Sequence, residues 1–102
     1  MYLIQIFLPM YGNRGEKFPA SYYREVRDRL VDQYGGITAY TRSPAQGMWQ
    51  PEEGKTVQDD LVIYEVMVEE LDRTWWDACK TSLEQQFQQE AVIIRAQAIY
   101  LL

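Results

Sequence analysis

The alternation of apolar and polar residues predicts four β-strands. They are residues 2–8, 37–42, 56–68 and 91–100. The first of these is apolar on both sides of its period of two, with Ile4 and Ile6 on one side and Leu3 and Phe7 on the other. A strand with two apolar sides belongs in the middle of a sheet that is covered on both faces.

Spacings of three and four residues predict two helices between these strands. The first follows Pro19 and ends at Gly35-Gly36, because glycine tolerates the left-handed conformation that a helix end commonly needs. The second follows Asp72, a good N-cap residue. Its expected buried stripe is Trp76, Cys79, Leu83 and Phe87.

This order predicts one α+β domain over residues 1–102, with the arrangement βαββαβ. Two right-handed βαβ units in series interleave into a four-stranded antiparallel sheet of order 4-1-3-2, with both helices on one face. We expect the loops at 9–18 and 43–56 to lie at the same end of the sheet and to form a rim over the helix-free face.

The helix-free face is expected to be largely apolar. If the Ile4 side packs on the helices, the other side displays Leu3, Gln5, Phe7, Tyr40, Arg42, Ile63, Glu65, Met67, Ile93, Arg95, Gln97 and Ile99. A hairpin without a net bulge would place Tyr40 opposite Glu65. Large exposed apolar patches usually mark an interface or a ligand groove. The simplest cover is a second copy of the chain, so we expect a homodimer.

Composition excludes several classes of function. The formal net charge is −5 and histidine is absent. The acidic balance argues against nucleic acid and anionic membranes as partners. RNA-recognition modules share the βαββαβ order, but they need basic and aromatic motifs on the central strands, which the run Tyr64-Glu65-Val66-Met67 lacks. A single cysteine gives no sign of an oxidising compartment, so a cytoplasmic location is the default expectation.

Glu65 and Arg95 are the first candidate site residues. An unpaired buried charge is costly, so both need partners on a covered face. In one interpretation they pair with each other or across the dimer, and Gln5 and Gln97 complete the hydrogen bonds. In the other they form the polar floor of a pocket for a small acid or phenol-like ligand. Glu65 would then be a candidate general base if desolvation raised its pKa.

Tyr40, Arg42 and Trp49 are the second group of candidates. These residue types are common in interfaces, so they either attach the hairpin arm to the sheet or to a partner subunit, or form a lid over a pocket. Three other features favour structural roles. Gly12-Asn13-Arg14-Gly15 could form an anion-binding nest, although a plain loop is the simpler interpretation. Cys79 and the pair Trp75-Trp76 fit packing better than chemistry. Carboxylates show no metal-ligand spacing, and no cofactor is expected.

The β-α-β-β-α-β order with a mixed open face resembles the ferredoxin-like fold in its dimeric α+β barrel version. The segment Gly36-Ile37-Thr38-Ala39-Tyr40-Thr41-Arg42, followed by Gly47-Met48-Trp49, is similar to a pattern in small bacterial proteins without assigned function. The barrel superfamily includes small oxygenases, isomerases and haem enzymes that act on chlorite or dyes. A histidine-ligated haem is impossible here, and fold likeness alone does not determine function.

Two functional hypotheses therefore remain from the sequence. The first is a homodimeric domain of unknown function whose sheet faces meet around a small cavity for an organic ligand. The alternative is a cofactor-free enzyme, similar to an oxygenase or isomerase, acting on a small organic substrate. In that case Glu65 would be the base, Arg95 and Tyr40 would orient the substrate, and Trp49 would lie near the entrance.

Overall fold

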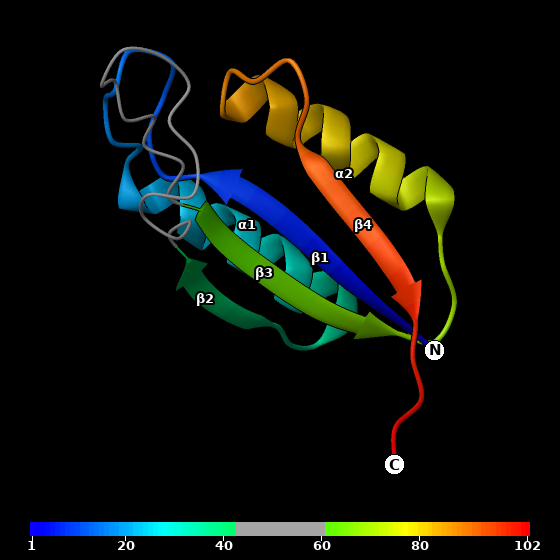
Figure 1. Cartoon of the computed structure of the whole chain (residues 1–102). Helices are drawn as coiled ribbons and strands as arrows, with labels where there is room; N and C mark the ends of the chain where they lie inside the picture. The colour runs from blue at the N-terminus through cyan, green and yellow to red at the C-terminus, as the bar shows by residue number, and fades with distance from the viewer. Residues whose placement is uncertain (43–60) are drawn as a thin grey trace, which may run out of the picture.

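The computed structural model describes residues 1–42 and 61–102, which form two helices and an antiparallel sheet (Figure 1). The elements are β1 (Tyr2–Pro9), α1 (Ala20–Tyr34), β2 (Thr38–Arg42), β3 (Leu61–Val68), α2 (Arg73–Gln86) and β4 (Ile93–Ala98). The strands are ordered β2-β3-β1-β4, and each pairs with its neighbours in the antiparallel sense. The predicted α+β class, with two helices and an antiparallel sheet, is confirmed.

The predicted interior position of the first strand is confirmed. β1 pairs with β3 along one edge and with β4 along the other. Its residues Ile4, Ile6 and Leu8 are at most 1% exposed. β1 therefore joins β3 to β4 in the interior of the sheet.

The start of α2 and the end of α1 lie where their local chemistry favours them. The Asp72 side chain accepts a hydrogen bond from the Trp75 backbone N–H at 3.1 Å, which caps α2. At the end of α1, Gly35 adopts a φ of +83° and donates its N–H to the Val31 carbonyl at 2.7 Å. Only glycine adopts this left-handed conformation without steric cost.

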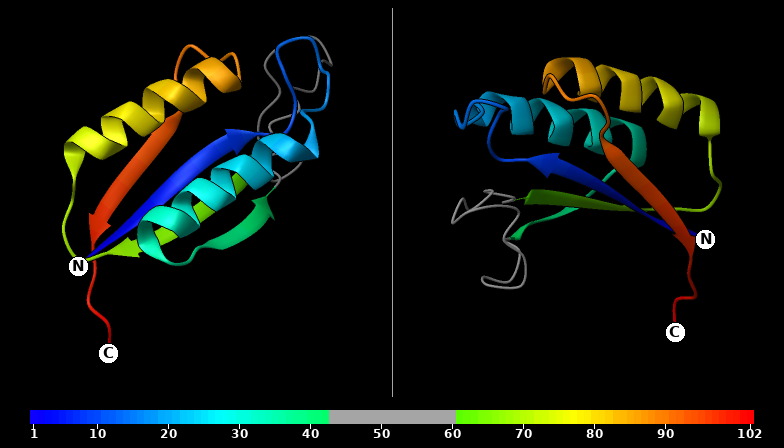
Figure 2. Two further views of the ribbon diagram at one scale, coloured as in Figure 1. Left: turned by 180° about the vertical axis from the view of Figure 1, so that it is seen from behind. Right: turned by 45° about the horizontal axis from the view of Figure 1, so that its top comes forward.

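One hydrophobic core lies between the sheet and the two helices, which cover the same face (Figure 2). α1 contributes Val26 and Leu30. From α2 come Trp76, Cys79 and Leu83, and Phe87 follows at its C-cap, so the predicted stripe is confirmed. Within the described parts of the chain, neither helix is long and apolar enough to cross a membrane.

The opposite face of the sheet, which we call the open face, is only partly exposed. Met67 and Ile93 are 55% and 62% exposed, as expected for positions that no helix of the described residues covers. Ile63, opposite Phe7, is 1% exposed. Ile63 thus lies on this side of the sheet, as expected, but it is buried and not displayed to solvent.

The register of β2 also differs from the expectation. Tyr40 lies opposite Ile63, and Thr38 is the residue opposite Glu65. The hairpin is thus displaced by two positions relative to the bulge-free alignment. A shift of two keeps every residue on its original face, because side chains alternate with a period of two. The predicted arm at 43–56 lies outside the described residues.

A glycine-to-alanine pair tests the end of α1. We expect Gly35→Ala to lower the free energy of unfolding by about 1 kcal/mol, because alanine is strained at positive φ. Gly36→Ala is the matched control, since Gly36 also has open space around it but no positive φ. Urea unfolding of both variants measures the difference, and equal stabilities would contradict the assignment.

Candidate ligand-binding site on the open face

Three polar side chains are joined in a row across the centre of the open face. The Gln5 amide nitrogen donates to Glu65 Oε2 at 2.6 Å, and Arg95 Nε donates to Gln5 Oε1 at 2.9 Å. The register explains the row, because Gln5 lies directly opposite both Glu65 on β3 and Arg95 on β4. We call this row the Glu65–Gln5–Arg95 chain.

The direct pairing of Glu65 with Arg95 that the sequence suggested is wrong. The ion pairs within the described residues involve other side chains, and β1 lies between the two strands that carry Glu65 and Arg95. Two strand spacings separate β3 from β4, which is about 10 Å. The Gln5 amide fills that gap, and its two ends match the two charges: its N–H group faces the carboxylate and its oxygen faces the guanidinium.

The Arg95 guanidinium lies over an aromatic ring. Its central carbon is 4.7 Å from the centroid of Phe7, in a cation–π arrangement. Arg95 is exposed, and among the described residues only its Nε–H is used in a hydrogen bond. Its two terminal amino groups therefore present four N–H donors, in the planar geometry that matches a carboxylate.

Apolar side chains surround this polar row. Leu3 and Phe7 flank Gln5 on β1, Met67 follows Glu65 on β3, and Ile93 precedes Arg95 on β4. Mostly apolar walls around a few placed polar groups are typical of small-molecule sites. This arrangement can thus bind the negatively charged group of a ligand at Arg95, while the apolar part of the same ligand lies against the surrounding apolar side chains.

The remaining predicted site residues are not part of this hydrogen-bonded row. Gln97 lies opposite Leu3 on the same face and is exposed, and its side chain makes no hydrogen bond within the described residues. The backbone places Tyr40 and Arg42 on β2, opposite Ile63 and Leu61. Trp49 lies outside the described residues. The predicted set is therefore brought together at Gln5, Glu65 and Arg95.

The glycine loop before α1 is filled by the protein's own carboxylate. Glu16 Oε2 accepts from the Arg14 backbone N–H at 3.0 Å, and the Gly12 N–H donates to the Glu16 carbonyl at 2.7 Å. A side chain at Gly12 would lie 1.9 Å from Glu16 Oε1. The loop therefore bonds to its own acidic residue, which favours the plain-loop interpretation over an anion site.

The thiol and the tryptophans have packing roles, as predicted. Cys79 is 1% exposed, and burial raises the pKa of its thiol, which disfavours the reactive thiolate. Trp76 stacks on Tyr34 with 7° between the ring planes, while Trp75 lies under the Arg29 guanidinium at 5.4 Å. The part of the chain that the structure describes contains no group of three side chains suited to a metal ion.

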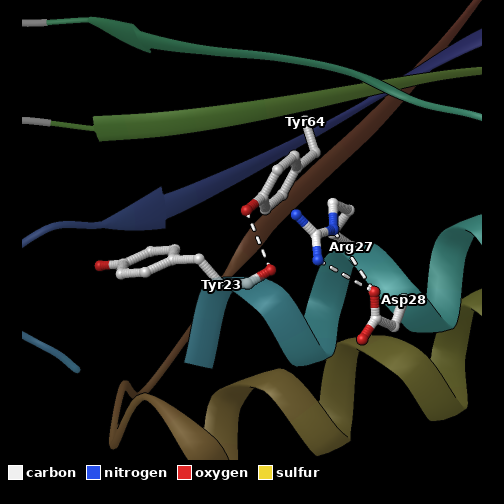
Figure 3. A network of polar contacts seen from close by, with 4 residues as sticks. All are labelled: Tyr23, Arg27, Asp28 and Tyr64. Carbon is white, nitrogen blue, oxygen red and sulfur yellow. Dashed lines mark hydrogen bonds and ion pairs between the residues drawn. The ribbon is translucent and has the colours of Figure 1, made fainter. Parts of the chain in front are cut away.

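Sequence reasoning missed a tyrosine contact beneath the helices. The Tyr64 hydroxyl donates to the Tyr23 carbonyl at 3.1 Å (Figure 3), and the Tyr23 hydroxyl donates to the Pro9 carbonyl. Burial, with a smaller effect of Tyr64, raises the pKa of Tyr23 to about 12. Both hydroxyls stay protonated and join α1 to the sheet, so they stabilise the fold on which the open face is built.

Comparison with known proteins adds a likeness in fold. No family model matches the chain, and no curated protein matches it. A solved structure titled "phage SAM lyase in complex with S-methyl-5'-thioadenosine" has a TM-score of 0.63, with 15% sequence identity over 94% of this chain and 79% of that chain. At this identity the likeness shows a common small α+β fold.

Substitution of Gln5 tests the polar row. We expect Gln5→Leu to lower the free energy of unfolding by about 1–3 kcal/mol, because two partners lose charge-assisted hydrogen bonds. Gln97→Leu on the same face is the control and should stay within about 0.5 kcal/mol of the parent. Denaturant unfolding is the measurement. Equal effects of the two substitutions would show that Gln5 does not join its neighbours.

A pH series tests the Tyr23 contact. The raised pKa of about 12, against 10.0 for free tyrosine, means that the unfolded chain loses this proton first as pH rises. The contribution to stability is therefore complete below pH 10 and is lost between about pH 10 and 12. Tyr23→Phe should lower the free energy of unfolding at neutral pH by about 1 kcal/mol. The free energy of unfolding of this variant should then decline less steeply than that of the parent between about pH 10 and 12. Parallel curves for parent and variant would contradict this.

Proposed function

We propose that this protein binds a small organic acid on the open face of its sheet. The observation that supports this most directly is the Glu65–Gln5–Arg95 chain. It fixes the Nε side of the guanidinium and leaves the terminal amino groups of Arg95 directed away from Gln5 as donors for a carboxylate. Phe7, Met67 and Ile93 supply the apolar surface on which the body of the ligand would lie.

The proposal includes a second copy of the chain as the cover of this face. Met67 and Ile93 are each more than half exposed, and their burial against a partner would remove apolar surface from water. The architecture that we propose is the ferredoxin-like fold in its dimeric α+β barrel version, which the topology supports. A cytoplasmic location is consistent with the single, buried cysteine.

A second candidate is a cofactor-free enzyme that acts on a small organic substrate. The likeness in fold to a lyase bound to S-methyl-5'-thioadenosine favours it. In this candidate Glu65 accepts a proton from the substrate, and Arg95 and Tyr40 orient it. Trp49 is assigned to the entrance, as the sequence suggested.

A ligand screen by thermal unfolding distinguishes these functions. We expect aromatic carboxylates such as benzoate or salicylate to raise the midpoint, because a ligand that binds only the folded state stabilises it. Arg95→Met should abolish that shift, since the variant keeps the length of the side chain without its N–H donors. Arg24→Met, an exposed position on α1, is the matched control and should keep the full shift.

The outcomes of the screen differ for each function. No shift with any carboxylate, or a shift that Arg95→Met retains, would contradict the acid site. S-methyl-5'-thioadenosine carries no carboxylate, so a shift with this compound alone would favour the enzyme. Chromatography of the incubated mixtures would then show turnover that Glu65→Gln abolishes.

A further inference from the structure

β4 has an outer edge on which Arg95 is the one charged residue of the strand. It is the last strand of the sheet beside β1. Edge strands commonly carry lysine, proline or a bulge that prevents pairing with another chain. From residue 96 to 102 the sequence is Ala-Gln-Ala-Ile-Tyr-Leu-Leu, which contains no charge and no proline.

The backbone groups of this edge alternate in direction. The Ile99 N–H donates to the Met1 carbonyl at 3.0 Å, so the odd-numbered residues of this segment direct their N–H groups toward β1. The even-numbered residues, among them Ala96 and Ala98, consequently direct theirs away from the sheet. These outward groups form a row available for another strand.

The segment that follows β4 is apolar and exposed. Tyr100 and Leu101 are 93% and 64% exposed, and Leu102 is also exposed. In all three views of the fold this segment extends beyond the end of the sheet (Figures 1 and 2). Three consecutive large apolar residues in water are unfavourable unless another surface covers them.

A groove that suits such residues lies between β4 and α2. It has a volume of about 340 Å³ and is lined by Leu71 and Trp76, by Ile94 and Ala96 of β4, and by Arg73 and Asp77 at the start of α2. Ala96 and Ala98 have small side chains and are exposed, so the core side of β4 is incompletely covered by α2.

We propose that the outer edge of β4 and residues 99–102 bind the same segment of a second copy as an antiparallel strand pair. A two-fold axis at Ala98 places Ala96 opposite Tyr100 of the second copy and Ile94 opposite its Leu102. The even-numbered side chains then lie on the core side, where Tyr100 and Leu102 cover the groove of the other chain. The pairing is isologous, so each chain gives and receives the same contacts.

The area involved is sufficient for a specific contact. The three exposed residues each offer on the order of 100–200 Å². If half of this surface is buried in both chains, together with an equal area of the surface that it covers, roughly 600–1,200 Å² is removed from water. This range includes the lower limit of about 1,000 Å² for a specific interface. The backbone hydrogen bonds of the new strand pair add to this.

This contact uses a different surface from the proposed ligand site. Edge pairing extends the sheet and does not cover its open face, although the register places Leu101 of the second copy beside Arg95, at the rim of the proposed ligand site. The edge contact does not depend on the proposed function. A protein that makes both this contact and the proposed face-to-face contact would contain four chains.

Ala98→Pro tests the edge contact by removing one outward N–H group without affecting the pairing with β1. Proline is tolerated on an edge strand when its position faces outward. We expect the parent to have at least twice the chain mass of 12.1 kDa in light scattering, and Ala98→Pro to have half of the mass of the parent. Ala98→Thr keeps the N–H group and should keep the mass of the parent.

A second variant is needed because Ala98→Pro could change the mass through a folding defect. Tyr100→Asp/Leu102→Asp changes side chains that are exposed in the single chain, so it should fold as the parent does, as judged by circular dichroism, and should also have half the mass. A monomeric parent, or a folded double variant with the parent's mass, would overturn the proposal. If benzoate fails to raise the unfolding midpoint but the masses are as expected, the proposed ligand site is contradicted and the edge contact is not.

Discussion

The packing of both helices against one face of the sheet is the constraint from which the other properties of this domain follow. Ile4, Ile6 and Leu8 of β1 are buried beneath the helices, and the tyrosine contact through Tyr23 and Tyr64 joins α1 to the same layer. Because residues alternate along a strand, the burial of one side of β1 places Leu3, Gln5 and Phe7 on the other. The open face is thus a direct consequence of how the core is built.

Within that face, the position of β1 between β3 and β4 determines the chemistry. A carboxylate and a guanidinium on directly adjacent strands would form an ion pair and neutralise each other. Here the Gln5 amide separates them and bonds to both, so the two charges lie at opposite ends of one row. The result is a dipolar surface in an apolar setting, with Phe7 supporting the cationic end.

The fold is shared with a phage SAM lyase at 15% identity, so it provides a scaffold and leaves the function to individual side chains. The two surfaces that this chain leaves incompletely covered differ in character. The open face combines charged and apolar groups and suits a small ligand. Residues 96–102, at the end of β4 and after it, are uncharged and suit a strand of the same sequence.

The sequence by itself determined the elements and the core. Local rules set them: the period of two in residues 2–8, the helical spacing around Leu30 and Leu83, Asp72 as an N-cap and Gly35 as a helix end. Only the tertiary structure decided which side chains contact one another across the strands and in the loop. Pairing of Glu65 with Arg95, within the chain or across a dimer, was one of two interpretations, and the register placed Gln5 between them. Tyr40 lies opposite Ile63, two positions from the bulge-free alignment. The Glu16 carboxylate bonds to the backbone of the glycine loop. Contacts between strands depend on register and on the space between elements, and these are set by packing across the whole domain, which no local pattern of residues records.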